Sequence, residues 1–198
     1  MNHFNSIREL LNTLSRGNKL IAEMFEKRKT PSYRYEYAVE LTEFDFAGLC
    51  EILQDEEVMY AYEHAFSDEE VQDWLNRNLK RYSDNGFGLW AVIKKDTNEF
   101  IGQCGLTIQE IDNEKYLEIG YLLKKRYWHN GFAIEAATAC KTYAFEKLNQ
   151  RKVYSIIRTN NFASQKVAEG VGMKVEKEVI KHYYKMDMPH YIYCIEKI

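Results

Sequence analysis

The sequence lacks several features that would place it in a specialised class of protein. Its 198 residues carry a formal net charge of −3, which argues against a general nucleic-acid binder. Cys50, Cys104, Cys140 and Cys194 lie far apart and form no CxxC pair, so neither a disulfide framework nor a zinc site is expected. No apolar run is long enough to span a bilayer. We therefore expect a reduced, cytoplasmic protein with no membrane partner.

Signatures of common cofactor sites are missing as well. Neither G-x-G-x-x-G nor G-x-x-x-x-G-K-[ST] occurs, which counts against a dinucleotide or nucleoside-triphosphate fold. His64, His129, His182 and His190 do not show metal-ligand spacing such as HExxH. We therefore expect no metal site.

The composition is that of an ordinary globular protein. Hydrophobic residues make up 45% of the chain and charged residues 29%, and the length suits one domain with a substantial core. Within residues 3–28 the apolar residues recur at helical spacing, with an interruption at 15–18. We divide the chain into an N-terminal helical extension, residues 1–30, and a domain over residues 31–198.

Within this domain, helical and extended patterns alternate in an order that predicts an α+β protein. The clearest helix start is Ser67-Asp68-Glu69-Glu70, which has the form of a capping box. Turn residues at 96–98 and 112–113 join three strands into an antiparallel meander. Helices are predicted at 42–54, 67–82, 131–148 and 163–169, and strands at 33–41, 87–94, 100–111, 116–123, 153–158, 174–180 and 191–196.

The stretch RYWHNGFAIEA, residues 126–136, passes from a strand into a helix through one glycine. The first amides of a helix lack internal partners and carry partial positive charge, so such a junction suits an anion. Gly131 has no Cβ, so its backbone can approach a phosphate oxygen or take a positive φ. Upstream, Lys124, Lys125 and Arg126 would attract an anion. The alternatives are a plain turn and a solvated strand end.

A second motif makes the first one more specific. YLEIGYLLKKRYWHNGFAIEAA is followed about 25 residues later by NFASQKVAEGVGM. Together they resemble the GNAT superfamily of N-acetyltransferases, and most of all its ribosomal-protein N-terminal acetyltransferase branch. The family loop is [QR]-x-x-G-x-[GA]; here Trp128 replaces its first residue, while Gly131 and Ala133 are kept. The resemblance runs from Thr42 to the C-terminus.

This resemblance implies a GNAT fold, in which a mixed, mostly antiparallel sheet is flanked by helices and splayed between its fourth and fifth strands. Acetyl-CoA would lie in the splay as a cosubstrate. The thioester would meet the backbone at Leu123, the pyrophosphate would meet amides of the glycine loop, and the pantetheine would pass the second motif. The implied cofactor-binding residues are Leu122, Leu123, Trp128, His129, Asn130, Gly131, Phe132, Ala133, Asn161 and Ser164.

For catalysis, the resemblance points to Glu118 as the base that takes a proton from the attacking amine. The alternative is a solvent-facing strand glutamate. The tyrosine acid of many relatives is replaced by Ala168, so Ser164 is the candidate acid; otherwise it is only a CoA contact. A base helps because about one lysine ε-amine in 2,500 is neutral near pH 7, against roughly one α-amine in ten.

The acceptor is left open by the sequence. An aromatic loop, with Tyr60, Tyr62, His64 and Phe66, would border its site, either holding an amine by cation–π contact or acting as a hydrophobic plug. The first hypothesis is acetyl transfer to a primary amine such as a protein N-terminus. The alternatives are a small amine, such as a polyamine or an aminoglycoside, and a catalytically weak acyl-CoA-binding regulatory module. The N-terminal helices would cover the sheet, shape the acceptor groove or form a homodimer contact.

Overall fold

The structure, a computed structural model, describes residues 35–183 and 186–197. The helices predicted within residues 1–30 lie outside the described residues, so the N-terminal extension stays a prediction. The first half of the described chain contains β1 (Tyr35–Glu40), η1 (Glu43–Asp45), α3 (Phe46–Leu53), η2 (Met59–Tyr62), α4 (Asp68–Asn85), β2 (Leu89–Lys94) and β3 (Glu99–Ile111). The second half contains β4 (Glu114–Leu123), η3 (Lys125–Tyr127), α5 (Phe132–Glu146), β5 (Lys152–Arg158), α6 (Phe162–Val171), β6 (Lys174–Tyr183) and β7 (Met186–Glu196).

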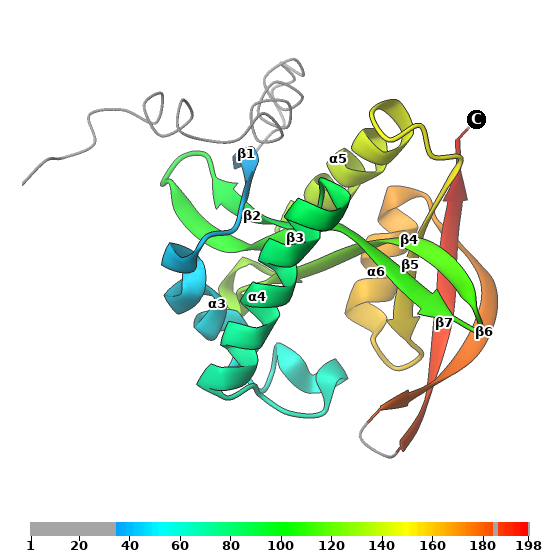
Figure 1. The fold of residues 1–198 in the computed structure, drawn as a ribbon, viewed down its shortest axis with the longest axis horizontal. Helices are drawn as coiled ribbons and strands as arrows, with labels where there is room; N and C mark the ends of the chain where they lie inside the picture. Colours follow the sequence, from blue (N-terminus) through cyan, green and yellow to red (C-terminus); the bar gives the residue numbers. More distant parts are fainter. Residues whose placement is uncertain (1–34, 184–185, 198) are drawn as a thin grey trace, which may run out of the picture.

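The described strands form one sheet in the order β1-β2-β3-β4-β5-β7-β6. Neighbouring strands are antiparallel except for β4 and β5, which are parallel. The α4 helix crosses one face of the sheet, and α5 and α6 lie on the other (Figure 1). Strand alternation sends neighbouring residues to opposite faces: Trp90 packs with α5, whereas Ala91 packs with α3 and α4.

The predicted opening between the fourth and fifth strands is present. Strand β4 pairs with β3 along its whole length, from Leu123 with Gly102 to Glu114 with Ile111. By contrast, β4 and β5 pair in register only at Glu118 and Tyr154. Beyond that pair the strands diverge toward the carboxyl end of β4. The predicted mixed, mostly antiparallel sheet, splayed at this place and flanked by helices, is confirmed.

The main difference from prediction is the length of the last hairpin. Strands β6 and β7 reach to Tyr183 and from Met186, whereas the sequence pattern predicted strand only to 180 and from 191. The sequence pattern did not predict the start of β7 because it contains Pro189, and proline lacks the amide that a central strand needs. Its carbonyl still accepts a hydrogen bond from the Thr159 amide at 3.1 Å.

The helix starts follow the capping patterns of the sequence. Ser67 and Glu70 form the predicted capping box of α4, with the Ser67 amide 2.8 Å from the Glu70 carboxylate. Thr42 donates from its amide to Asp45 Oδ2 at 2.8 Å. The helix predicted from Thr42 begins as the short 3₁₀ turn η1 before it continues as α3.

Candidate active site

At the splay, side chains take over hydrogen bonds that a continuous strand ladder would make. The Ser155 hydroxyl donates to the Ile119 carbonyl at 2.9 Å. The Ile156 amide donates to Glu118 Oε1 at 3.3 Å. Buried backbone groups without partners cost free energy, so these bonds make the opening stable. Glu118 therefore has a structural role at the splay, whatever its chemical role.

Two cavities meet at this opening. The larger, about 450 Å³, lies on the α4 side, and the smaller, about 220 Å³, lies beside the starts of α5 and α6. Tyr121, Leu122, Asn161 and Ser164 line both cavities. A molecule bound in the smaller cavity can therefore present one end to a second molecule in the larger one. This arrangement suits a transfer reaction between two substrates.

The smaller cavity contains the predicted anion-binding junction. Gly131 is the N-cap of α5 with a φ of 84°, and a Cβ built on it would meet nothing within 4 Å. His129 also has a positive φ, 59°. The left-handed backbone conformation of these two residues turns the chain sharply into the helix, so the first amides of α5 face open space. The positive φ, more than crowding, is what requires a glycine here.

Nine of the ten predicted cofactor-binding residues line the smaller cavity. They are Leu122, Leu123, Trp128, His129, Gly131, Phe132, Ala133, Asn161 and Ser164. Asn130 does not line it: its side-chain amide donates to the Trp128 carbonyl at 2.7 Å, within the loop. Their roles in binding stay predictions.

The backbone of Leu123 has a free side, which the register of β3 and β4 identifies. The Lys124 amide donates to the Ile101 carbonyl at 2.9 Å, and Gly102 is the register partner of Leu123. In an antiparallel ladder this makes Gly102 and Leu123 a non-hydrogen-bonded pair. The Leu123 amide therefore points away from β3, toward the splay.

The second motif forms the start of α6. Asn161 is its N-cap, and Asn161 Oδ1 accepts hydrogen bonds from the Ser164 amide at 3.0 Å and from the Tyr60 hydroxyl at 2.6 Å. The Tyr121 hydroxyl donates to the Ser164 carbonyl at 2.7 Å. Sequence reasoning missed Tyr121, which borders both cavities; its neighbours in the strand are apolar, so the pattern indicated only core. Ala168, at the place of the absent tyrosine, is buried in the core.

Glu118 lies half-buried in the wall of the larger cavity. Thr107 Oγ1 donates to its Oε2 at 3.0 Å, and Gln109 donates to Thr107 Oγ1 at 3.0 Å. Burial raises the pKa of Glu118, while the positive charge of Lys181 and the hydrogen bonds oppose the rise. A carboxylate with a raised pKa, held in a cavity by neighbours, has the properties of a general base.

The aromatic loop covers the end of the larger cavity next to α4. Tyr62, Phe66 and Trp74 pack edge to face, with ring centroids 6.0–6.3 Å apart. His64 Nε2 lies 2.9 Å from the Glu70 carboxylate, at the start of α4. The same α4 face brings Arg77 and Arg81 to the cavity, and sequence reasoning missed both. Their spacing from Trp74, at one helical face, is the signal that would have found them.

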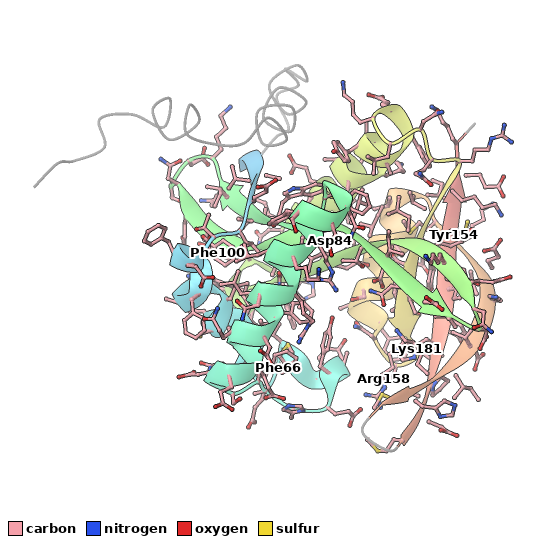
Figure 2. The ribbon with its side chains drawn as sticks, viewed as in Figure 1. Phe66, Asp84, Phe100, Tyr154, Arg158 and Lys181 are labelled. Carbon is pink, nitrogen blue, oxygen red and sulfur yellow. The ribbon has the colours of Figure 1, made fainter. Side chains whose placement is uncertain are left out.

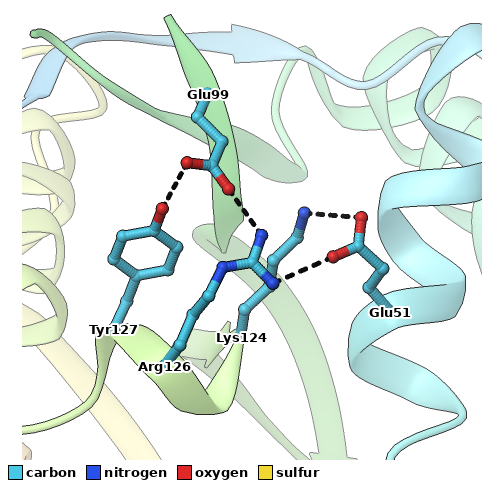
Figure 3. A network of polar contacts seen from close by, with 5 residues as sticks. All are labelled: Glu51, Glu99, Lys124, Arg126 and Tyr127. Carbon is cyan, nitrogen blue, oxygen red and sulfur yellow. Dashed lines mark hydrogen bonds and ion pairs between the residues drawn. The ribbon is translucent and has the colours of Figure 1, made fainter. Parts of the chain in front are cut away.

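The basic run before the glycine loop does not face the smaller cavity. Lys124 Nζ lies 2.9 Å from Glu51 Oε1, and Arg126 bridges Glu51 at 3.1 Å and Glu99 at 2.5 Å (Figure 3). The Tyr127 hydroxyl also donates to Glu99.

Lys125 pairs with Glu57 in the same way, so all of the basic run is engaged in ion pairs. The expectation that these cations draw an anion into the loop is therefore wrong, because acidic partners distant in the sequence hold them. Their role is to fix η3 and the loop after it against α3 and β3.

Within residues 35–183 and 186–197, no group of histidine, cysteine, aspartate or glutamate side chains could hold a metal ion. No helix in the same residues is long and apolar enough to cross a membrane. All four cysteines are free; the Sγ atoms of Cys104 and Cys140 lie 3.6 Å apart in the core.

Comparisons with known proteins agree with the geometry. Residues 38–174 match the acetyltransferase (GNAT) domain family. The uncharacterized protein YkkB of Bacillus subtilis (strain 168) is 38% identical over 130 residues, which cover 66% of this chain and 76% of the relative.

Solved structures of acetyltransferases also resemble this structure in fold. One is spermidine N-acetyltransferase from Vibrio cholerae in complex with CoA and spermine, with a TM-score of 0.65 and 19% identity, covering 80% of this chain and 94% of that one. Another is ribosomal-protein-S5-alanine acetyltransferase from Vibrio fischeri, with a TM-score of 0.59 and 16% identity, covering 84% and 95%. At such low identity they show a shared fold and not a shared acceptor.

Proposed function

This chain belongs to the GNAT acetyltransferase family, and from that premise we propose that it transfers acetyl from acetyl-CoA to a primary amine. The observation that carries the proposal is the meeting of the two cavities at the splay. One cavity ends on a helix start suited to phosphate, and the other holds a half-buried carboxylate suited to accept a proton.

The residues of the smaller cavity fit the parts of acetyl-CoA. Amides from Trp128 to Ala133 would hold the pyrophosphate, and the open space at Gly131 supports this placement. Asn161 and Ser164, at the start of α6, would line the pantetheine arm. The Leu123 amide, turned toward the splay, would donate a hydrogen bond to the thioester carbonyl and stabilise the oxyanion that forms during transfer.

In the larger cavity, Glu118 would accept the proton that the amine loses as its nitrogen attacks the thioester carbon. The carbon–sulfur bond then breaks and leaves CoA as a thiolate. Ser164 lines both cavities and would donate a hydrogen bond to that sulfur. A thiol has a pKa near 8.5, far below that of a serine hydroxyl, so Ser164 stabilises the thiolate while its proton comes from solvent.

The acceptor has two candidate classes, a protein N-terminus and a small amine. The structural neighbours include a spermidine acetyltransferase and a ribosomal-protein acetyltransferase. A third hypothesis, a catalytically weak acyl-CoA-binding module, keeps the smaller cavity but needs no acceptor.

The test is release of the CoA thiol from acetyl-CoA, measured with a thiol reagent in the presence of N-terminal peptides or small amines. Mass spectrometry then identifies the acetylated product. Acceptor-dependent release supports the proposal. Binding of acetyl-CoA without release, for every acceptor of both classes, would favour the binding module instead.

A further inference from the structure

The larger cavity is strongly cationic, although the chain as a whole carries a net charge of −3. Among the described residues, four cationic side chains line it against one carboxylate, that of Glu118. The cationic side chains are Arg77, Arg81, Arg158 and Lys181. The cavity lining therefore holds a local excess of positive charge that the net charge of the chain does not reveal.

The cations come from both walls of the cavity. Arg158, at the end of β5, and Lys181, on β6, lie across from the loop that carries Phe66 (Figure 2). Glu63, from that loop, pairs with Arg158 and ties the two walls together. The guanidiniums of Arg77 and Arg81 come from α4 and have no comparable acidic partner.

Arg77 and Arg81 are one helical turn apart, where like charges destabilise a helix. In the described part of the chain, neither forms a hydrogen bond or an ion pair, although Asp73 lies one turn before Arg77. Arg81 is half-buried, and burial together with the charge of Arg77 lowers its pKa, while Glu118 opposes the change. Both guanidiniums therefore keep their hydrogen-bond donors available on the cavity side, with Glu118 as the nearby carboxylate.

Gln103 provides an independent observation in the same cavity. Its side chain is fully buried, and Gln103 Oε1 accepts a hydrogen bond from Trp74 Nε1 at 3.1 Å. An indole nitrogen can only donate, so this bond fixes which way the amide points. Gln103 lines the cavity, and its Nε2 has no partner among the described residues. A buried donor without a partner costs free energy, and an acceptor atom of a bound molecule would offset that cost.

These observations require the same kind of partner. We infer that the acceptor carries an anionic group, a carboxylate or a phosphate, close to its amine, and that Arg77, Arg81 and Gln103 bind that group. Guanidinium forks match carboxylate and phosphate oxygens, and the amide adds a further donor. The amine then faces Glu118, and polycationic amines are poor acceptors because the cavity repels them.

This inference rests on the proposed function, and matched amines test it. O-phosphoethanolamine is compared with ethanolamine, and β-alanine with propylamine, by release of the CoA thiol. For at least one pair, we expect kcat/KM to be about tenfold higher or more for the anionic member, as for a charge-assisted hydrogen bond. Spermidine is expected to be the poorest acceptor.

The source of the anion is distinguished by two peptides that differ only in an aspartate or an asparagine at the second residue. If discrimination occurs with the peptides alone, the anion comes from an acidic N-terminal segment. If it occurs with the small amines, the acceptor is a free amino or phospho compound. Either result supports the inference.

Variants identify the residues responsible. Arg77→Gln and Arg81→Gln are each expected to reduce the preference for the anionic member about tenfold, mainly through its KM. Lys80→Gln is the matched control: Lys80 lies on the same helix and has the same charge, but it does not line the cavity and pairs with Asp84 at 2.8 Å. It should leave the preference unchanged. The arginine variants should unfold at or above the wild-type temperature, since a like-charge contact is removed.

The inference is overturned if acetyl-CoA is consumed with equal or greater efficiency on the uncharged or cationic members. It is also overturned if Lys80→Gln reduces the preference as much as the arginine variants. If acetyl-CoA does not bind at all, which calorimetry shows directly, the proposed function itself has failed.

Discussion

Tyr60 and Asn161 are 101 residues apart in the sequence, yet the Tyr60 hydroxyl lies 2.6 Å from Asn161 Oδ1. This bond ties the aromatic loop to the start of α6, at the border where the two cavities meet. Because Asn161 also caps α6, the contact couples the position of the loop to the helix that would line the pantetheine arm.

Replacing Tyr60 by phenylalanine removes this hydroxyl and keeps the ring. We expect acetyl-CoA affinity to fall by about threefold to tenfold, since a hydrogen bond is worth about 0.5–1.5 kcal/mol. The free energy of unfolding should fall by about 0.5 kcal/mol, because Tyr60 is partly exposed and water can replace it. Titration calorimetry and urea unfolding measure the two effects. An unchanged affinity would show that the contact does not shape the binding cavity.

Gly131 has a matched control in Gly86. Both have positive φ, 84° and 75°, and in both a built Cβ meets nothing within 4 Å. Replacing either by alanine should therefore cost about 1 kcal/mol of stability, through backbone strain alone.

The two alanine variants should differ in ligand binding. Gly131→Ala is expected to weaken acetyl-CoA binding tenfold or more in calorimetry, about 1.4 kcal/mol. Gly86→Ala, at the end of α4, should leave it unchanged. Equal affinities in the two folded variants would remove the glycine loop from the binding site.

Glu51 joins the ion-pair network that holds η3. Hydrogen bonding from Lys124, followed by that from Arg126, lowers the pKa of Glu51. A carboxyl group whose pKa is lowered in the folded state stabilises the fold above its unfolded pKa, near 4.5, and that stabilisation disappears as pH falls through the folded value. Glu51→Gln should therefore lower stability at neutral pH and leave it unchanged in acid.

The expected loss at pH 7 is about 1 kcal/mol. Lys124 is buried and loses its partner, but Glu51 is half-exposed, which weakens the pair. Urea unfolding from pH 3 to pH 7, wild type against variant, measures the difference. A constant difference across this range would contradict the electrostatic explanation.

Local sequence signals predicted the parts of the site that local chemistry determines. Gly131 was recognised from the local pattern, because a positive φ at the start of a helix favours glycine. Asn161, which caps α6, was identified only through the family resemblance. The splay itself came from family resemblance. Its stabilising bonds, such as Ser155 with Ile119, join residues on different strands and leave no pattern in the sequence.

Features that depend on distant partners could not be predicted. Lys124 and Arg126 looked available for an anion because Glu51, more than 70 residues earlier, gives no local sign of pairing with them. The sequence analysis did not single out Arg77 and Arg81. Their spacing from Trp74 places all three on one face of α4, but that this face borders a cavity follows from its packing, such as that of Trp74 against Gln103.

Glu118→Gln separates the two roles of Glu118, because glutamine keeps an oxygen for the Ile156 amide but cannot take a proton. If Glu118 is the general base, kcat should fall about 10²–10⁴-fold while acetyl-CoA affinity hardly changes. Glu110→Gln, an exposed glutamate on β3 outside both cavities, is the matched control and should retain full activity.

The pH dependence of stability and of activity tests whether Glu118 takes up a proton. Burial raises the pKa of Glu118 above 4.5, so the folded state holds this proton more tightly than the unfolded state does. Stability contributed by this group therefore falls as pH rises from 4.5 through the folded pKa, and Glu118→Gln should gain stability relative to wild type over that interval.

Wild-type activity should fall as pH drops through the pKa of Glu118 or of the amine, whichever is higher, whereas the activity of the variant should follow only the pKa of the amine. An α-amine is already about one-tenth neutral near pH 7 and needs little help. Near-normal turnover by the variant, with the expected gain in stability, would leave Glu118 as a structural residue of the splay and leave catalysis to the positioning of the two substrates.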